Sequence, residues 1–186
     1  PDLGPSRNAS APTPLMRLSA GSVQVEFDPD CGALRRILLG DREVLRGIYA
    51  AVRDRNWGTV PAQIQNLTTE VAPDAFLLTF DADCRQEGVH CVWHGSIQGF
   101  ADGGLCFTFD GEARTDFLRN RIGLCVLHPL RECAGAPARQ HRTDGTTIQG
   151  RFPDTIEPQI IGEASFRDLR AIAHEVRPGH WAEIEF

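Results

Sequence analysis

The sequence has no apolar stretch that approaches the ~18 residues a helix needs to span a bilayer. It also has no basic segment followed by an apolar one, which would mark a secretory signal. Basic residues are in the minority: 19 Lys and Arg stand against 25 Asp and Glu, for a net charge of −6. An acidic chain is not attracted to nucleic acid or to an anionic membrane, so we expect neither as a partner.

Signatures of the common catalytic and cofactor sites are missing too. There is no GxSxG, no glycine-rich phosphate loop and no paired-carboxylate motif. His90 and His94 would converge on a helix, but the surrounding Val and Trp favour a strand, on which they would stand about 13 Å apart. We therefore expect no metal site and no cofactor.

The six cysteines form no CxxC pair: they are Cys31, Cys84, Cys91, Cys106, Cys125 and Cys133. A chain of 186 residues can bury about 70% of its unfolded surface, which is a sufficient core without disulfides. We therefore expect reduced thiols and a cytoplasmic location.

The pattern that is present is alternation. Val23, Val25 and Phe27 face one way along a half-buried strand, and polar residues occupy the positions between them. Turn signals recur every 8–12 residues or so, and no long helical period competes with them, which predicts an all-β, antiparallel, supersandwich-like β-sandwich. The expected strands are 23–28, 34–39, 44–52, 64–71, 76–84, 89–100, 105–113, 122–127, 146–149, 169–176 and 181–186. Loop is expected at 135–141 and 153–158, and two-residue hairpin chemistry at Gly40-Asp41.

Residues 1–17 are expected to form a flexible lead-in, because residues 1–14 are rich in proline and contain no core-forming pattern. Residues 18–186 then form the sandwich domain. The chain stops at Phe186 in mid-alternation, without a turn or a polar tail, so we expect it to be a fragment of something longer.

The most informative stretch runs from Phe117 to Cys133. Arg119 and Arg121 flank Asn120 and lead into a continuous apolar run, which predicts a strand buried on both faces. On a strand the two arginines share a face with Gly123, roughly 6–7 Å apart, beside the notch that the missing side chain leaves.

Two interpretations of this arginine pair stay open. The guanidinium groups pair with acids such as Asp116 or Glu132 at the sheet edge. Alternatively, they cradle a sugar acid or lactone, where one preorganised donor to an oxyanion is worth roughly 3 kcal/mol. At the end of the run, His128 is a candidate general base with a pKa near neutrality, or else a solvated, hydrogen-bonded residue.

A second candidate is Asn56-Trp57, inside the polar cluster Arg53–Gly58. Sugars stack their C–H faces on Trp while their hydroxyls bond amides, so this pair predicts a carbohydrate contact. The alternative is a buried Trp whose N–H is satisfied in a turn. The candidate substrate-binding residues are Arg119, Asn120, Arg121, His128, Asn56 and Trp57.

Residues 34–186 resemble the N-terminal part of the bacterial D-apionate lactonase family. The stretches that carry the resemblance, in order, are RGIYAAVRDRNWGTVP (46–61), FLRNRIGLCVLHPLRECAG (117–135), FPDTIEPQ (152–159) and FRDLRAIAHEVRPGHWAEIEF (166–186).

The resemblance implies a lactonase that hydrolyses D-apionolactone to D-apionate in a sugar-catabolic pathway, with a small sugar lactone as substrate. It also implies a catalytic body beyond residue 186 of the same chain, and it assigns no catalytic residue. Residues 1–186 alone are then expected to be inactive. The alternatives are a non-catalytic carbohydrate-binding or architectural β-sandwich module, and an isomerase of the aldose-epimerase kind.

Overall fold

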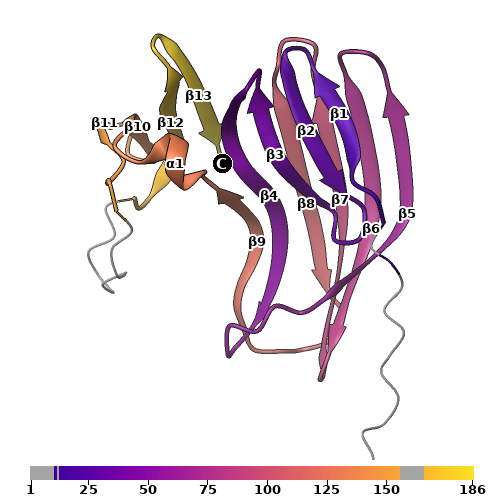
Figure 1. Ribbon diagram of the computed structural model, residues 1–186. Helices are drawn as coiled ribbons and strands as arrows, with labels where there is room; N and C mark the ends of the chain where they lie inside the picture. The colour runs from indigo at the N-terminus through magenta and orange to yellow at the C-terminus, as the bar shows by residue number, and fades with distance from the viewer. Residues whose placement is uncertain (1–10, 12, 156–165) are drawn as a thin grey trace, which may run out of the picture.

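The computed structural model describes residues 11, 13–155 and 166–186, and these residues form three antiparallel sheets (Figure 1). Two of the sheets face each other as a sandwich, and the third stands to one side. The predicted antiparallel β-sandwich is confirmed. Among the described residues, no helix has the length and apolar character that crossing a membrane requires.

The first sheet has the strand order β1-β2-β3-β4-β9. Its strands are β1 (Met16–Ala20), β2 (Val23–Asp28), β3 (Ala33–Leu39), β4 (Arg42–Asp54) and β9 (Arg119–Leu127). The predicted two-residue turn at Gly40-Asp41 joins β3 to β4, with Gly40 at φ +63°, a conformation that glycine adopts without strain. β1 was not predicted, because only Leu18 and Ala20 of its five residues are buried.

The second sheet is a four-stranded meander in the order β5-β6-β7-β8. Its strands are β5 (Ala62–Val71), β6 (Phe76–Gln86), β7 (Val89–Gly99) and β8 (Leu105–Ala113). All four were predicted. A turn joins β7 to β8, in which the N–H of Phe100 donates to the carbonyl of Gly104 at 2.9 Å and the N–H of Gly103 donates to the carbonyl of Phe100 at 3.0 Å.

The core lies between these two sheets. Val25 and Phe27 are buried, as the alternation on β2 predicted, and Phe27 meets Phe80 of the opposite sheet with ring centroids 5.8 Å apart. The aromatic contacts continue through Trp93, 5.3 Å from Phe80, to Phe109, 5.0 Å further on. Each fully buried large side chain contributes about 1.5–3 kcal/mol, so this stack is a main source of stability.

The third sheet has the order β11-β10-β12-β13. It consists of β10 (Pro137–Arg142), β11 (Thr147–Arg151), β12 (Leu169–Arg177) and β13 (His180–Glu185), and it follows a one-turn helix, α1 (Leu130–Cys133). The prediction of loop at 135–141 was wrong: β10 shows no apolar alternation, and it is a strand because it pairs on both sides, with β11 and β12.

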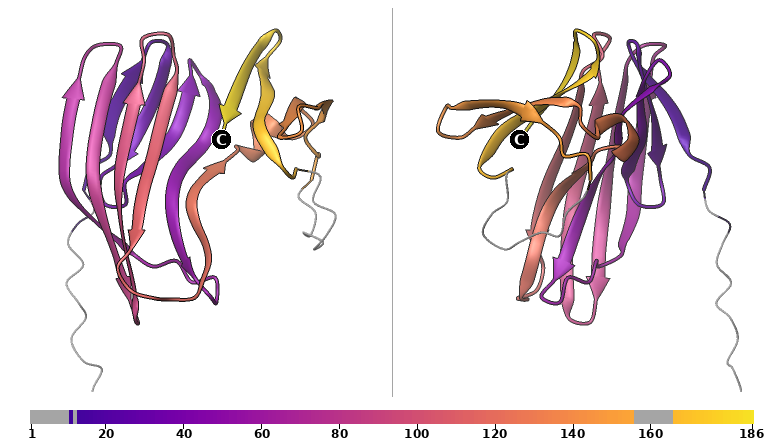
Figure 2. Two further views of the ribbon diagram at one scale, coloured as in Figure 1. Left: turned by 180° about the vertical axis from the view of Figure 1, so that it is seen from behind. Right: turned by 60° about the vertical axis from the view of Figure 1, so that its left-hand side comes forward.

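Reciprocal arginine contacts join the third sheet to the β3–β4 hairpin. Arg42 donates to the carbonyl of Val176 at 3.3 Å, and Arg177 donates to the carbonyl of Leu39 at 3.1 Å and also binds the Asp41 carboxylate. In both views of Figure 2 the third sheet lies beside one end of β4 and β9 and leaves the other end uncovered by described residues.

The prediction that 122–127 is buried on both faces was also wrong. In the part of the chain that the structure describes, β9 is the edge strand of the first sheet, and its pairing is with β4 alone. Leu124 and Leu127 are 40% and 44% exposed. A continuous apolar run does not distinguish a doubly buried strand from an edge strand that carries apolar residues on its open side.

Part of the expected lead-in can be described. Residues 1–10 and 12 lie outside the described residues, as do 156–158 of the irregular stretch expected at 153–158. The backbone N–H of Thr13 donates to the Asp30 carboxylate at 3.0 Å, and β1 begins at Met16. All six cysteines are free, and Cys106 is exposed.

Candidate functional site

The turn between β4 and β5 presents Trp57 to solvent. The Asp54 carboxylate accepts the backbone N–H groups of Asn56 and Gly58, both at 2.8 Å, and the Asp54 carbonyl accepts the N–H of Trp57 at 3.2 Å. Trp57 is 55% exposed and has φ +68°, a backbone conformation that costs a non-glycine residue free energy. An aromatic side chain held outward in this way needs an explanation other than packing. The alternative of a buried Trp57 is excluded.

Arg53 is fixed beside this turn. Its guanidinium donates to Thr59 Oγ1 at 3.0 Å, to the Trp57 carbonyl at 3.4 Å and to the Tyr49 hydroxyl at 3.4 Å. All three acceptors are neutral. They hold the Arg53 side chain in place, but they do not compensate its positive charge.

The β4–β9 ladder brings Arg121 to the same place. Gly123 lies opposite Ala51, and Cys125 lies opposite Tyr49, on the face that points away from the second sheet. Alternation places Arg53 on this face of β4 and Arg121 on the matching face of β9. The other face, which includes Val52 and its partner Ile122, packs into the core.

Arg121 stacks on Trp57, with its Cζ 5.4 Å from the ring centroid. Arg119 lies two residues before it, and both arginines are exposed. Neither makes a salt bridge within 4.0 Å with an acid among residues 11, 13–155 and 166–186. In the described part of the chain, the alternative that these arginines pair with Asp116 or Glu132 is therefore not seen.

These side chains surround an open hollow of about 550 Å³. Its lining residues are Ala51, Arg53, Trp57, Arg119, Arg121, Ile122, Gly123, Leu124 and Cys125. The floor is made by the small pair Ala51 and Gly123. Gly123 has φ +145°, and apart from its two chain neighbours no described residue comes within 4 Å of where its Cβ would stand. Among the described residues, the hollow is therefore lined by three guanidinium groups and by no acidic side chain, in a chain whose net charge is −6.

Three of the six sequence-predicted residues do not line this hollow: Asn56, Asn120 and His128. Asn56 lies on a different hollow, together with Asp54, Asp116 and other residues of the strand ends. Asn120 is half-buried and alternates to the other face of β9 from Arg119 and Arg121. The turn therefore separates Asn56 from Trp57, which adjacency in the sequence cannot reveal.

His128 lies elsewhere, at the contact between β9 and the third sheet. Its ring is 5.2 Å from His174 of β12 and 5.2 Å from Phe152. Burial first, and then the neighbouring His174, lower the pKa of His128 to about 4. Burial also lowers the pKa of His174, which is only 2% exposed. Both rings are thus neutral at pH 7, and the pKa of His128 lies well below the near-neutral value that the sequence suggested.

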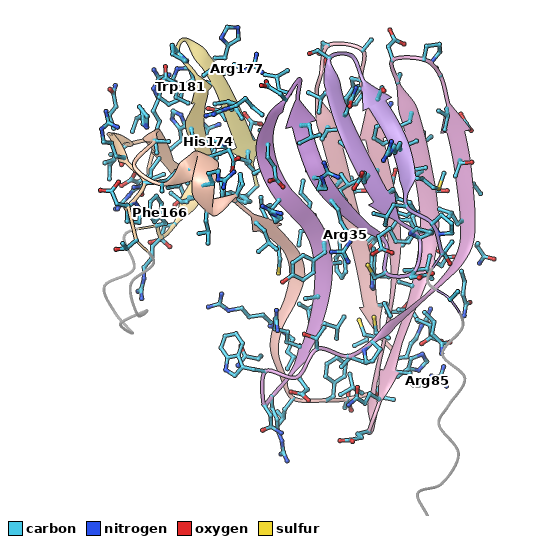
Figure 3. The ribbon with its side chains drawn as sticks, in the orientation of Figure 1. Arg35, Arg85, Phe166, His174, Arg177 and Trp181 are labelled. Atoms are coloured by element: carbon cyan, nitrogen blue, oxygen red, sulfur yellow. The ribbon has the colours of Figure 1, made fainter. Side chains whose placement is uncertain are left out.

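Figure 3 shows His174 and Phe166 in the part of the molecule that contains α1 and the third sheet, well away from Arg35 in the first sheet. An apolar hollow of about 400 Å³ adjoins His128, with Pro129, Leu130 and Cys133 among its lining residues. In the described chain, no group of three or more His, Cys, Asp or Glu side chains is arranged to hold a metal ion. His90 and His94 are on strand β7, as predicted, and pair with Asp83 and Asp81 at 3.2 and 2.9 Å.

Comparison with known proteins places this domain. The family described as the N-terminal domain of D-apionate lactonase matches residues 5–186. The chain belongs to this family. This family match begins at residue 5, whereas the resemblance noted from the sequence motifs began at residue 34.

A protein of Brucella anthropi named D-apionate lactonase is 37% identical over 167 residues. The aligned region is 89% of this chain and 26% of that relative. The chain thus spans about a quarter of the length of the D-apionate lactonase it matches.

Arg53 is the residue of the hollow that sequence reasoning missed as a site residue. It belongs to the polar cluster that drew attention to Asn56 and Trp57. The available signal was the alternation of side chains along β4: Arg53 lies two residues after Ala51, so both side chains lie on the same face of the strand. The pairing of β4 with β9 was needed to use that signal.

Proposed function

We propose that this chain is the N-terminal domain of a lactone hydrolase that converts D-apionolactone and water to D-apionate. In this proposal the outer face of β4 and β9 contributes contacts to the sugar. Membership of the family supports the reaction class, and the hollow between Trp57 and the arginines supports the location. The rest of the site would come from a catalytic body beyond residue 186.

The chemistry fits the groups present. Attack of water on the lactone carbonyl puts negative charge on its oxygen, and opening of the ring leaves a carboxylate and a hydroxyl. Guanidinium donors of Arg119 and Arg121 could stabilise that oxygen, with one preorganised donor worth roughly 3 kcal/mol. The Trp57 ring offers an apolar surface to the C–H groups of the sugar. No general base is proposed from the described residues.

The observation that carries the proposal is the set of three guanidinium groups around an exposed tryptophan, none of which has an acidic partner in the described part of the chain. Asn56, Asn120 and His128 are left out of the proposed contacts, since they do not line the hollow.

The compartment is proposed to be the cytoplasm, where the six free thiols would stay reduced. The pathway is proposed to be sugar catabolism.

The test uses the full-length protein with D-apionolactone as substrate. We expect Arg121→Gln and Arg119→Gln each to lower kcat/KM by about a hundredfold. Arg35→Gln is the matched control, because Arg35 lies in the same sheet but pairs with Asp28 at 2.8 Å outside the hollow. Unchanged kcat/KM in both hollow variants contradicts the proposed contacts.

The isolated chain of residues 1–186 is expected to show no turnover, and measurable turnover would contradict the role given to the catalytic body.

A non-catalytic carbohydrate-binding module is the second candidate, because an exposed Trp57 alone suffices for sugar stacking. In that case full-length variants of Trp57 would change sugar binding and leave kcat unchanged.

A further inference from the structure

We propose that Arg53, Arg119 and Arg121, together with Trp57, form an anion site that prefers the ionised carboxylate of a polyhydroxylated acid over the neutral lactone. This inference rests on the proposed function for the identity of the acid. Beyond that function, it states that the site binds the ionised acid in preference to the lactone. It also adds Arg53 to the contacts.

The charge balance of the hollow is the first argument. Three guanidinium groups line it, and in the described chain no acidic side chain does. The nearest acid along the chain, Asp54, has one carboxylate oxygen engaged by two backbone N–H groups of its own turn. A neutral lactone leaves these cations uncompensated, whereas a carboxylate accepts paired N–H donors from a guanidinium.

The second argument is that the site is fixed before a ligand arrives. Arg53 is held by three neutral oxygens, which leaves N–H donors of its fork free. Trp57 is held by the Asp54 turn, and Arg121 rests against the Trp57 ring. Little side-chain freedom is then lost on binding, which favours affinity in an exposed hollow.

The third argument concerns shape. Ala51 and Gly123 give the hollow a floor without large side chains, and the volume of about 550 Å³ exceeds that of a five-carbon acid. Trp57 supplies the apolar wall and the arginines supply the donors. Ring opening creates the carboxylate, so contacts to this anion strengthen once hydrolysis has occurred. The domain would therefore hold the product, and the full-length enzyme would be inhibited by it.

The experiment measures binding of D-apionate and of D-apionolactone to residues 1–186 by calorimetry at low ionic strength. We expect D-apionate to bind at least about tenfold more tightly, and added salt to weaken it, because exposed charge contacts are screened. Arg53→Gln and Arg121→Gln should each weaken D-apionate binding about tenfold, with little effect on the lactone.

Arg139→Gln is the matched control. Arg139 stacks on Trp181 of the third sheet, 3.8 Å from the ring centroid, so it reproduces an Arg–Trp contact without the hollow. Circular dichroism of each variant confirms folding. Equal affinity for acid and lactone, or hollow variants that bind D-apionate as the unaltered chain does, would overturn the anion site.

The anion site and the proposed function can fail independently of each other. If full-length Arg121→Gln loses kcat/KM while residues 1–186 show no preference for D-apionate, the proposed function stands and the anion site fails. If D-apionate binds as expected and the full-length protein does not hydrolyse D-apionolactone, the reverse holds.

Discussion

Arg121 and Trp57 come from different segments of the chain, and the guanidinium of one lies over the ring of the other at 5.4 Å. An exposed contact between a cation and an aromatic ring is worth about 0.5–1 kcal/mol. Its effect on stability is therefore small. Its effect on geometry is larger, because it fixes the direction of a charged side chain at the rim of the hollow.

Trp57→Gly is expected to leave the fold nearly as stable as before. Glycine removes the strain of φ +68°, about 1–2 kcal/mol, and this offsets the lost contact with Arg121. We expect the free energy of unfolding to change by less than about 1 kcal/mol in urea titrations, and D-apionate binding to fall at least about tenfold. Trp93→Gly is the contrasting variant: Trp93 is buried, and losing it should cost about 3–5 kcal/mol.

Asp54→Ala is expected to loosen the turn that presents Trp57. The variant removes the acceptor of the Asn56 and Gly58 N–H groups, at a cost of about 1–2 kcal/mol. D-apionate affinity should fall although Asp54 does not line the hollow, which makes Asp54 a positioning residue. Asp54→Asn keeps an acceptor oxygen, so it should restore most of the affinity. Equal losses in the Ala and Asn variants would assign the effect to charge instead of to the turn.

The free energy of unfolding is expected to fall as the pH drops from 6.5 towards 4. Burial lowers the folded-state pKa of His128 from 6.5 to about 4, so the unfolded chain binds the proton first. At about 1.4 kcal/mol per tenfold change in proton affinity, His128 alone accounts for up to about 3 kcal/mol. His174 acts in the same direction.

The lowered pKa values of Asp81 and Asp144 also make the free energy of unfolding fall with pH, but chiefly as the pH drops through 3.8 and below, whereas His128 acts between pH 6.5 and 4. His128→Leu should flatten the pH dependence in that window, measured by urea unfolding at pH 7 and pH 4.5. An unchanged slope in this variant would show that His128 is not the group responsible.

Thiol labelling is expected to separate the cysteines by burial. Cys106 is exposed and should react first under native conditions. Burial raises the pKa values of Cys84 and Cys133 to about 11, so these thiols should react only after unfolding. Cys125 lines the hollow, and D-apionate should slow its labelling without affecting Cys106. Mass spectrometry of labelled peptides distinguishes the sites.

The sandwich could be predicted from the sequence because its strands carry their own signals. The alternation Val23, Val25, Phe27 and the turn at Gly40-Asp41 each specify local structure without distant partners. The strand β10 could not be predicted, because its stability depends on β11 and β12 on either side. The burial of β9 was misjudged for a related reason: composition does not say which strand ends a sheet.

The candidate site was predictable in part. Arg119, Arg121 and Trp57 were chosen for the chemistry of their side chains, and the structure brings all three to one hollow. Arg53 needed the register that sets Ala51 opposite Gly123. His128 was chosen for its ordinary titration range, whereas its pKa depends on burial against His174, a residue far along the chain.

The position of β9 at the sheet edge has a consequence for solubility. An edge strand offers unpaired backbone groups to other chains, and protruding charges are a common protection against strand-to-strand aggregation. Arg119 and Arg121 supply such charges on β9, the strand that also carries the exposed Leu124 and Leu127. Variants that replace both arginines by apolar residues should therefore self-associate, and Gln or Lys is the better choice for separating ligand binding from oligomerisation.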